Sequence, residues 1–382
     1  MNIAVTTRLL LDNNMTGVGW FTFETIRRVV EKHPEHTFYY LFDRPYDPKF
    51  ITSNNIIPII IKPKCRFHPI FYHLWYEILI PRVLKKHKID LFLSCDGILS
   101  LSTKVPTVLT VHDLAFEHFP QFIPNGMSKY LRKVTPKFAN KALFITAVSE
   151  YTKKDIVERY HINPDKITVV YNGTNQSFRA YSEKEKELIQ KEYAENNPFF
   201  LFLGTIHPRK NLKNQLLAYD SFRKNNPALK HKFLVVGNRW IWGKEMNEIY
   251  NSMTFKSDVI FIGHLPTDKL VALMASATAL MYVSIFEGFG IPIIEAFETE
   301  TPVITSNTSS MAEIAGDAAL TVDPYNIDEI AKAMSSIVID KEKTASLVSK
   351  GKERKSFFSW DKTASLFDSV LCKSIDEINK NH

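Results

Sequence analysis

Residues 285–295 read Ile285-Phe286-Glu287-Gly288-Phe289-Gly290-Ile291-Pro292-Ile293-Ile294-Glu295, so that two glutamates frame a glycine-bearing turn. The turn follows a strand-like run, residues 279–283, and precedes a helix-like run, residues 292–298. Glycines after a buried strand let a ligand approach backbone N–H groups, and the helix start adds further donors there. Two carboxylates beside a phosphate-binding backbone indicate a nucleotide-sugar site. The alternative is an exposed loop with a helix-start glutamate, because acids are favoured in a first helical turn.

Short β-branched runs alternate with helix-like segments along both halves of the chain, which predicts parallel sheets covered by helices on both faces. The predicted strands are residues 3–10, 38–42, 56–61, 90–94, 107–111, 143–148, 167–170, 199–203, 232–236, 259–262, 279–283, 302–306 and 320–322. Asn172-Gly173-Thr174 interrupts the alternation, and the charged residues 181–197 form a hinge or a short helix. Two doubly wound α/β units are the simplest arrangement.

Size and composition agree with two globular domains. The chain has 382 residues, 45% of them hydrophobic, which is too long for one ordinary core. Its three cysteines, Cys65, Cys95 and Cys372, lack metal-ligand spacing and are typical of a reducing compartment. The sequence starts directly with a strand, and no apolar run approaches the ~20 residues that cross a bilayer. We therefore expect a cytoplasmic protein.

The net charge is +7, and part of the excess is local. Basic residues flank the apolar and aromatic stretch 67–80, namely Lys62, Lys64, Arg66, Arg82, Lys85, Lys86 and Lys88. Such a surface suits peripheral contact with the inner face of a cell membrane. The alternative, which the pattern favours, is an amphipathic helix over residues 70–86 that packs Phe71, Trp75, Ile78 and Leu79 inward. No nucleic-acid-binding motif is recognised, so no nucleic-acid partner is expected.

The spacing of Glu287 and Glu295 resembles the E-x7-E motif of retaining GT-B glycosyltransferases, the family-4-type group that includes mannosyltransferases. The match continues through residues 301–306, 313–319 and 322–324. The resemblance implies a GT-B architecture, in which two Rossmann-like doubly wound domains face each other across a cleft. It places residues 1–178 and 360–382 in the first domain, onto which a final helix crosses back, and 179–359 in the second.

A basic pair follows the first strand of the second half, in Gly204-Thr205-Ile206-His207-Pro208-Arg209-Lys210-Asn211. Two basic residues at a helix start suit a diphosphate, although a solvated loop is the commoner reason for such a pair. Family members carry a similar Pro-Arg-Lys-Asn signature that holds the donor phosphates. Many relatives also have an arginine where this chain has Thr205, so Arg209 is expected to supply the guanidinium alone.

His112 ends a predicted strand and is followed by Asp113. A histidine at the carboxyl end of a parallel strand faces the ligand crevice, although such residues often serve as structural hydrogen-bonders. In the family, a His-Asp pair at this place belongs to the active centre. The resemblance gives His112 contact with the transferred sugar and not the role of general base.

Further glycine turns complete the expected donor site. Gly17 and Gly19 resemble the first glycine loop of the family, whose backbone approaches the donor phosphate and the acceptor. A tight turn favours glycines in any case. Gly263, His264 and Leu265 resemble a loop that borders the nucleotide base. The segment Gly288-Phe289-Gly290 lies between the two glutamates.

The helix that carries Glu295 ends differently from that of relatives, which usually have glycine where this chain has Glu300. A left-handed cap at Glu300 would cost on the order of 1 kcal/mol relative to glycine.

The resemblance implies a retaining hexosyltransferase, with mannose favoured, that uses a GDP- or UDP-sugar and a glycan or lipid-linked glycan acceptor in cell-surface polysaccharide or lipopolysaccharide synthesis. Glu287 would hold donor-sugar hydroxyls, Glu295 the ribose hydroxyls, and Arg209 with Lys210 the leaving diphosphate. In the family pattern the leaving phosphate deprotonates the acceptor. No Asp-x-Asp motif lies near the phosphate site, so no metal or other cofactor is expected.

Two other functions remain open. A nucleotide-sugar epimerase on the same architecture would convert the donor without an acceptor. A non-catalytic protein would bind a sugar nucleotide or a membrane surface without turnover.

Overall fold

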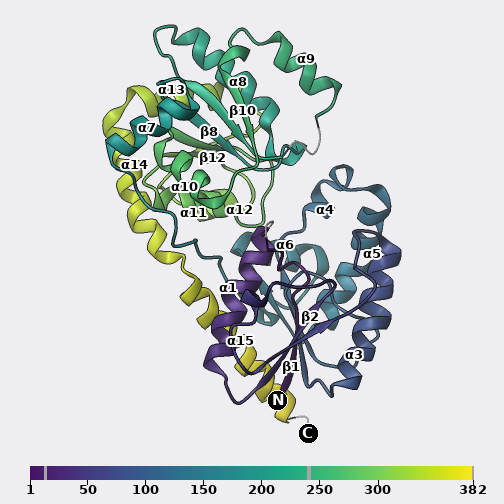
Figure 1. The fold of residues 1–382 in the computed structure, drawn as a ribbon. Coiled ribbons are helices and arrows are strands. Elements are labelled where there is room, and N and C mark those ends of the chain that lie inside the picture. Colours follow the sequence, from purple (N-terminus) through teal and green to yellow (C-terminus); the bar gives the residue numbers. More distant parts are fainter. Residues whose placement is uncertain (13–14, 239–241, 381–382) are drawn as a thin grey trace. The chain divides into compact units, whose positions relative to one another are not determined.

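Strands and helices alternate throughout the computed structural model, which describes residues 1–12, 15–238 and 242–380 (Figure 1). The chain divides into two compact units, one formed by Met1–Gly173 with Ser359–His382 and the other by Thr174–Phe358. The sequence placed these boundaries at 178/179 and 359/360. Each unit contains one parallel sheet, so the predicted α/β class with two doubly wound units is confirmed.

The first unit is built on a seven-stranded parallel sheet. Its strands, in spatial order, are β3 (Ile56–Ile60), β2 (Thr37–Phe42), β1 (Asn2–Thr6), β4 (Leu91–Ser94), β5 (Thr107–Val111), β6 (Phe144–Ala147) and β7 (Ile167–Val169). The order reverses between β1 and β4, which is where ligands bind in open α/β sheets. The prediction of one strand over residues 3–10 was wrong beyond Thr6, because the chain turns there and the Leu10 N–H donates to the Thr7 carbonyl.

Helices cover this sheet on both sides (Figure 1). They are α1 (Gly17–Lys32), α2 (Pro69–Tyr72), α3 (Ile80–Lys86), α4 (Ala115–His118), α5 (Asn125–Lys141), α6 (Glu150–Tyr160) and α15 (Trp360–Lys380), with the short 3-10 turns η1 (Pro48–Phe50), η3 (Pro120–Phe122) and η4 (Pro164–Lys166). The helix predicted over residues 70–86 consists of α2, a π-helical segment η2 (His73–Leu79) and α3. Of the side chains expected to pack inward, Trp75 is buried and Phe71, Ile78 and Leu79 are half-buried, so the core-packing interpretation is only partly confirmed. Tyr72 and Tyr76 are buried beside Trp75.

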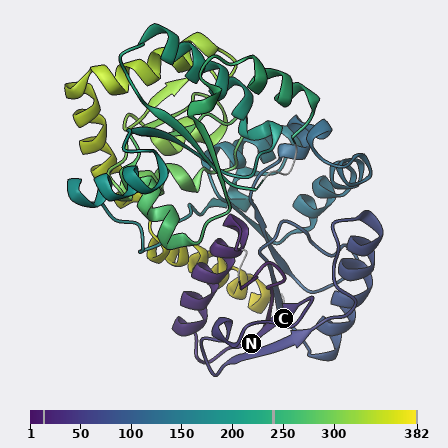
Figure 2. The same cartoon turned by 45° about the horizontal axis from the view of Figure 1, so that its top comes forward.

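Helix α15 packs along α1, as Figure 2 shows for the yellow and purple helices. Two polar contacts fasten the pair, because Arg28 donates to Asp361 at 2.6 Å and the His33 ring lies 2.6 Å from Asp368. The chain enters α15 beside Gly173, where a Cβ would lie 2.3 Å from the Trp360 backbone nitrogen.

The second unit has a six-stranded parallel sheet. Its strands, in spatial order, are β10 (Val259–Gly263), β9 (Lys232–Val236), β8 (Phe199–Leu203), β11 (Ala279–Tyr282), β12 (Val303–Ser306) and β13 (Leu320–Val322). Nearly every side chain of β8, β9, β11 and β12 is buried, as expected for a sheet covered on both faces. The strand order reverses between β8 and β11, and this switch point positions the candidate site.

The covering helices are α7 (Glu183–Tyr193), α8 (Leu212–Asn225), α9 (Lys244–Ser252), α10 (Thr267–Ser276), α11 (Ile291–Glu298), α12 (Ser309–Ala315), α13 (Ile327–Ile339) and α14 (Lys341–Arg354), with the 3-10 turns η5 (Pro208–Lys210), η6 (Lys256–Asp258) and η7 (Lys355–Phe357). In Figure 1, α8 and α13 lie on one side of the sheet and α10 to α12 on the other. The charged segment 181–197 forms α7, which begins with a capping box between Ser182 and Glu185.

The close approach of two strand ends gives the first prediction. Gly237 follows β9 with φ +143°, and a Cβ there would lie 2.0 Å from the Gly204 carbonyl oxygen. Gly237→Ala should therefore destabilise the second unit by about 3 kcal/mol in urea unfolding. The matched control is Gly243→Ala, which meets no atom within 4 Å and should change stability by less than about 0.5 kcal/mol. Equal effects of the two substitutions would contradict this account.

The end of α11 gives the second prediction. Glu300 adopts φ +59°, the left-handed conformation anticipated at this position, and its carboxylate pairs with Lys352 at 2.8 Å. Both Glu300→Gly and Glu300→Ala remove the exposed ion pair, but only glycine relieves the backbone strain. The glycine variant should be more stable than the alanine variant by about 1 kcal/mol in denaturant unfolding. An alanine variant of equal stability would show that the left-handed backbone carries no strain.

Candidate functional site

Two loops meet at the switch point of the second unit. One follows β8 and contains η5, and the other follows β11 and leads into α11. The Ile285 N–H donates to the Arg209 carbonyl at 2.8 Å, which ties the loops together. The buried Asn211 amide donates to the carbonyls of Val283 (3.1 Å) and Pro324 (2.7 Å), and so fixes the start of α8 against the second loop. The site is therefore built on two loops that hydrogen bonds hold together.

A charged cluster lies where these loops touch. The Lys210 ammonium is 2.6 Å from Glu287 Oε1 and donates to the Tyr282 hydroxyl at 2.9 Å. Arg209 Nη1 lies 3.3 Å from Glu287 Oε2. Burial alone would raise the pKa of Glu287, but the charges of Lys210 and Arg209 outweigh it and lower this pKa to about 2. The carboxylate is therefore ionised at neutral pH, and the cluster carries one excess positive charge.

Two serines at the start of α12, Ser309 and Ser310, hold the turn between the two glutamates. Ser310 Oγ lies 2.9 Å from the carbonyl oxygens of both Glu287 and Phe289, which share its single proton, and the Glu287 N–H donates to Ser309 Oγ at 3.1 Å. Gly290 adopts φ +107° as the cap residue of α11. The carbonyls of Glu287 and Phe289 are thus occupied by Ser310. The backbone N–H groups at the start of α11 suit an anion.

Glu295 projects from the second turn of α11 and is half-buried. Within the described residues no side chain forms an ion pair or hydrogen bond with its carboxyl group. Burial raises the pKa of Glu295 to about 8. The two glutamates of the motif therefore differ in state, because Glu287 is ionised and paired whereas Glu295 is protonated at neutral pH.

A cavity of about 290 Å³ opens at the ends of β9 and β10. Gly237, Asn238 and Gly263 line it together with Phe261 and Ile262. Of the three residues expected around a nucleotide base, only Gly263 lines this cavity; His264 is exposed and Leu265 half-buried beside it.

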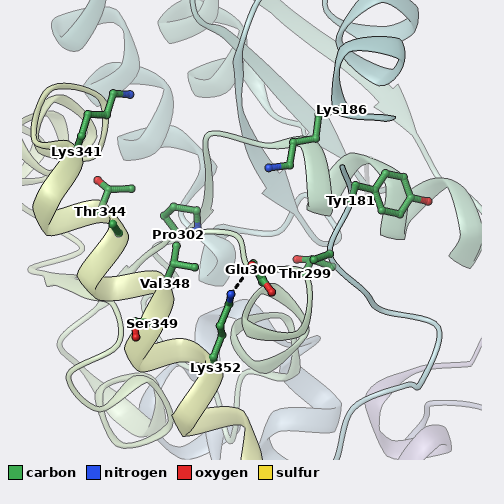
Figure 3. Close-up of a pocket in the computed structure, with 12 residues that line it drawn as sticks. Tyr181, Lys186, Thr299, Glu300, Pro302, Lys341, Thr344, Val348, Ser349 and Lys352 are labelled. Carbon is green, nitrogen blue, oxygen red and sulfur yellow. Dashed lines mark ion pairs between the residues drawn. The ribbon is translucent and has the colours of Figure 1, made fainter. Parts of the chain in front are cut away.

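A larger cavity of about 470 Å³ lies elsewhere in the second unit, between α14 and the end of α11 (Figure 3). Lys186 and Lys352 extend into it, and Lys352 pairs with Glu300. None of the residues predicted for the donor site lines it.

His112 belongs to the first unit and follows directly after β5. Its Nε2 is 2.8 Å from the Cys95 carbonyl, and burial lowers its pKa, so that the ring is neutral at pH 7. Because a carbonyl only accepts, Nε2 carries the proton and Nδ1 keeps a free lone pair. Gly17 and Gly19 both lie in the first turn of α1, and a Cβ at Gly19 would be 2.6 Å from the Leu9 carbonyl oxygen.

The sequence interpretation missed a buried polar cluster at the switch point of the first unit. Arg8 Nε lies 2.5 Å from Asp96 Oδ2 and 3.0 Å from the Tyr76 hydroxyl, and Nη2 donates to the Tyr72 hydroxyl at 3.2 Å. The cluster occupies the carboxyl ends of β1 and β4. Arg8 itself could have indicated this cluster, because it is a charged residue inside the run assigned to the first strand. A strand buried on both faces rarely carries an arginine.

Residues that could hold a metal ion occur at the contact of α1 with α15. His33 lies beside Asp368 and Cys372 there, and in a second grouping beside Glu35 and His36. Lys32 already pairs with Asp368, so a cation there would meet a neutralised carboxylate. In the described part of the chain, no helix is both long and apolar enough to span a bilayer.

The chain is similar to known proteins along most of its length. Residues 183–354 match the family described as Glycosyl transferases group 1, and residues 15–178 match Glycosyltransferase Family 4. The O-antigen chain mannosyltransferase RfbU of Salmonella typhimurium is 30% identical over 291 residues, which cover 75% of this chain and 76% of that protein. The O-antigen chain mannosyltransferase B of Escherichia coli is 26% identical over 255 residues, covering 66% and 67% of the two chains.

Solved structures share the fold at lower identity. Anabaena HepE in complex with UDP-glucose superimposes with a TM-score of 0.76 at 18% identity, covering 98% of this chain and 100% of that one. WaaG, a glycosyltransferase involved in lipopolysaccharide biosynthesis, superimposes with a TM-score of 0.75 at 14% identity, covering 96% and 99%. The predicted GT-B fold class is therefore confirmed. The chain is a glycosyltransferase. It belongs to the family whose first half matches Glycosyltransferase Family 4 and whose second half matches Glycosyl transferases group 1.

Proposed function

We propose that this glycosyltransferase moves a hexose, with mannose favoured, from a nucleotide-diphosphate sugar to a glycan or lipid-linked glycan during cell-surface polysaccharide synthesis. The observation that carries the proposal is the cluster of Lys210, Arg209 and Glu287 beside the start of α11. Cations, backbone amides and a hydroxyl-binding carboxylate within one pair of loops match the chemistry of a sugar diphosphate.

Breaking the bond between the sugar and the diphosphate puts negative charge on the leaving group and positive charge on the anomeric carbon. Arg209 and Lys210, with the amides near Gly288 and Gly290, would stabilise the departing diphosphate in its transition state. The excess positive charge of the cluster and the restraint by Asn211 support this role, because preorganised donors need little rearrangement.

The two glutamates would bind different hydroxyl groups of the donor. Glu287, ionised beside Lys210, would accept hydrogen bonds from the sugar hydroxyls. Glu295, with no protein partner in the described residues, would bind the ribose hydroxyls. In the first unit, the neutral ring of His112 would accept a hydrogen bond from the transferred sugar through Nδ1.

Retention of the anomeric configuration is supported by the match to the E-x7-E pattern. In the proposed step the bond from the anomeric carbon to the phosphate oxygen breaks, and a bond to the acceptor oxygen forms on the same face. The acceptor proton passes to the leaving phosphate, so this step requires no separate base. The Lys210 and Arg209 charges supply the electrostatic stabilisation, and we propose that the reaction is metal-independent.

The donor sugar is proposed from the relatives named as mannosyltransferases. A thermal-shift panel of GDP-mannose, UDP-glucose and UDP-galactose tests this assignment and the base together. The matching donor at 100 times its Kd should stabilise the protein by about 2.7 kcal/mol. A larger shift with a UDP-hexose would assign that donor instead, and no shift with any sugar nucleotide would refute the proposed function.

Arg209→Met tests the leaving-group assignment. The side chain is 25% exposed, so the fold should be retained, whereas release of nucleoside diphosphate from the donor should slow by about 100-fold or more. Lys213→Met is the matched control, because it removes an exposed cation from α8 that pairs with Glu245. Turnover of the Arg209 variant within twofold of the parent, or an equal loss in the control, would contradict the assignment.

The raised pKa of Glu295 gives a pH prediction. Below about pH 8 the group is protonated, and above it the carboxylate becomes a stronger acceptor for ribose hydroxyls. Affinity for the nucleotide-sugar should rise by about tenfold between pH 6.5 and 9, as measured by calorimetry. Glu295→Gln should abolish the rise, and Glu298→Gln, on the same helix but paired with Lys355, should retain it. The same pH profile in the parent and Glu295→Gln would remove Glu295 from the site.

Two measurements separate the alternatives. An epimerase would convert the donor alone into an isomeric nucleotide-sugar, which product analysis without acceptor detects. A binding protein without turnover would show the donor-dependent thermal shift, weakened in Glu287→Ala, but no transfer or hydrolysis in the parent.

A further inference from the structure

The larger cavity of the second unit has no role in the proposed donor site. It measures about 470 Å³ and lies between α7, the end of α11 and α14 (Figure 3). Its twelve lining residues all belong to the second unit, and none of them is among the residues proposed to bind the donor. Cavities of roughly 300–1,000 Å³ are typical of small-molecule sites. This cavity is therefore large enough for a ligand of its own.

Three lysines give this cavity its charge. Lys186 extends into it from α7 and Lys352 from α14, while Lys341 is the first residue of α14 (Figure 3). Of the described residues that line the cavity, only Glu300 is acidic. The lining therefore carries two excess positive charges, and the positive end of the α14 dipole adds to them.

The ion pairs that these lysines form are weak ones at the surface. Lys352 pairs with Glu300 at 2.8 Å. Lys186 pairs, also at 2.8 Å, with Glu183, a side chain that is 84% exposed and lies outside the lining. Lys341 forms no ion pair within the part of the chain that the structure describes. Because exposed ion pairs contribute little to stability, an anion of higher charge can replace the carboxylates.

Close packing behind the cavity fixes its shape. Helices α11 and α14 approach each other so closely that a Cβ at Gly351 would lie 2.9 Å from the Phe297 ring. On this framework the half-buried side chains of Pro302 and Val348 form an apolar part of the wall. The cavity thus combines cations with apolar surface in a preformed arrangement.

We propose that this cavity binds a small phosphate monoester. The phosphate lies among Lys186, Lys341 and Lys352, and the carbon skeleton lies against Pro302 and Val348. A phosphate monoester carries a charge of about −1.5 to −2 at neutral pH, which matches the excess charge of the lining. Lysine ammonium groups bind phosphate as point charges on flexible stems, so no fixed fork geometry is needed.

Two features separate this inference from other readings of the same charge. A nucleic acid binds along an extended basic face or stripe, whereas these cations surround a cavity. The inference also does not rest on the proposed function, because no residue proposed for the donor site lines the cavity.

The test is calorimetry on the full-length protein at low ionic strength. The probe is sn-glycerol 3-phosphate, with glycerol as its uncharged counterpart and inorganic phosphate as the anion without a carbon skeleton. The parent protein should bind glycerol 3-phosphate, should bind inorganic phosphate more weakly, and should not bind glycerol. Lys186→Gln/Lys352→Gln should lower the affinity for glycerol 3-phosphate by about 100-fold, since each charge-assisted hydrogen bond contributes about tenfold.

Glu300→Gln should have the opposite effect. The substitution removes the carboxylate from the lining and releases Lys352 from its ion pair. Affinity for glycerol 3-phosphate should therefore rise by about fivefold, because one repulsive charge near the phosphate is lost. A gain of affinity in a folded protein also keeps the proposal testable where the double lysine variant fails to fold.

Matched controls carry comparable changes elsewhere in the second unit. Lys224→Gln/Lys244→Gln removes two exposed cations that, like Lys186, pair with a carboxylate on their own helix. Its affinity for glycerol 3-phosphate should stay within about twofold of the parent. Arg209→Met should also retain this affinity, although the same substitution is expected to slow release of nucleoside diphosphate. The donor-dependent thermal shift should be unchanged in the cavity variants, which separates this inference from the proposed function.

Several outcomes would overturn the proposal. The parent could fail to bind glycerol 3-phosphate, or the control variant could lose as much affinity as the double lysine variant. A loss in Arg209→Met would place the bound anion at the candidate donor site instead. Inorganic phosphate that binds as tightly as the ester would refute a monoester, and weaker binding in Glu300→Gln would remove the cavity as the location.

Discussion

The Lys210 ammonium and the Glu287 carboxylate lie 2.6 Å apart, and the arrangement of the candidate site depends on that contact. The lysine ends the loop after β8, and the glutamate lies in the turn after β11, so the pair spans the switch point of the sheet. Either charge without the other would raise the free energy of the folded state, because an unpaired ion in a buried loop is strongly unfavourable. The pair holds cations where a diphosphate would need them while keeping the carboxylate ionised.

The sequence predicted most of the second unit because several local signals agree. Buried strands without alternation indicated a parallel sheet, and in such a sheet the residues after neighbouring strands must meet at one edge. The proximity of Arg209, Lys210 and Glu287 follows from that rule without any coordinates. The helix start at Ile291 and the left-handed backbone at Glu300 were also foreseeable, because both depend on neighbours in sequence.

Features that depend on distant contacts were not predictable in this way. The prediction placed Arg8 in a strand because the residues around it are apolar. In the structure Arg8 instead hydrogen-bonds to Asp96 and Tyr76, which lie far along the chain, in a buried cluster. The π-helical segment before Pro81 likewise escapes a pattern based on 3.6 residues per turn. The exposure of Phe67 was hidden for the same reason, since hydrophobicity alone does not tell which apolar residues remain outside the core.

The position of α15 has a consequence for the order of events during synthesis. The first unit is interrupted in the sequence, because residues 174–358 are inserted before Ser359 returns the chain to it. The face of α1 that packs against α15, where Phe21 contacts Phe367, stays uncovered until the entire second unit has left the ribosome. Translation therefore favours completion of the second unit before the first, the reverse of the usual order from the amino terminus. A nascent first unit is the species that chaperones would meet.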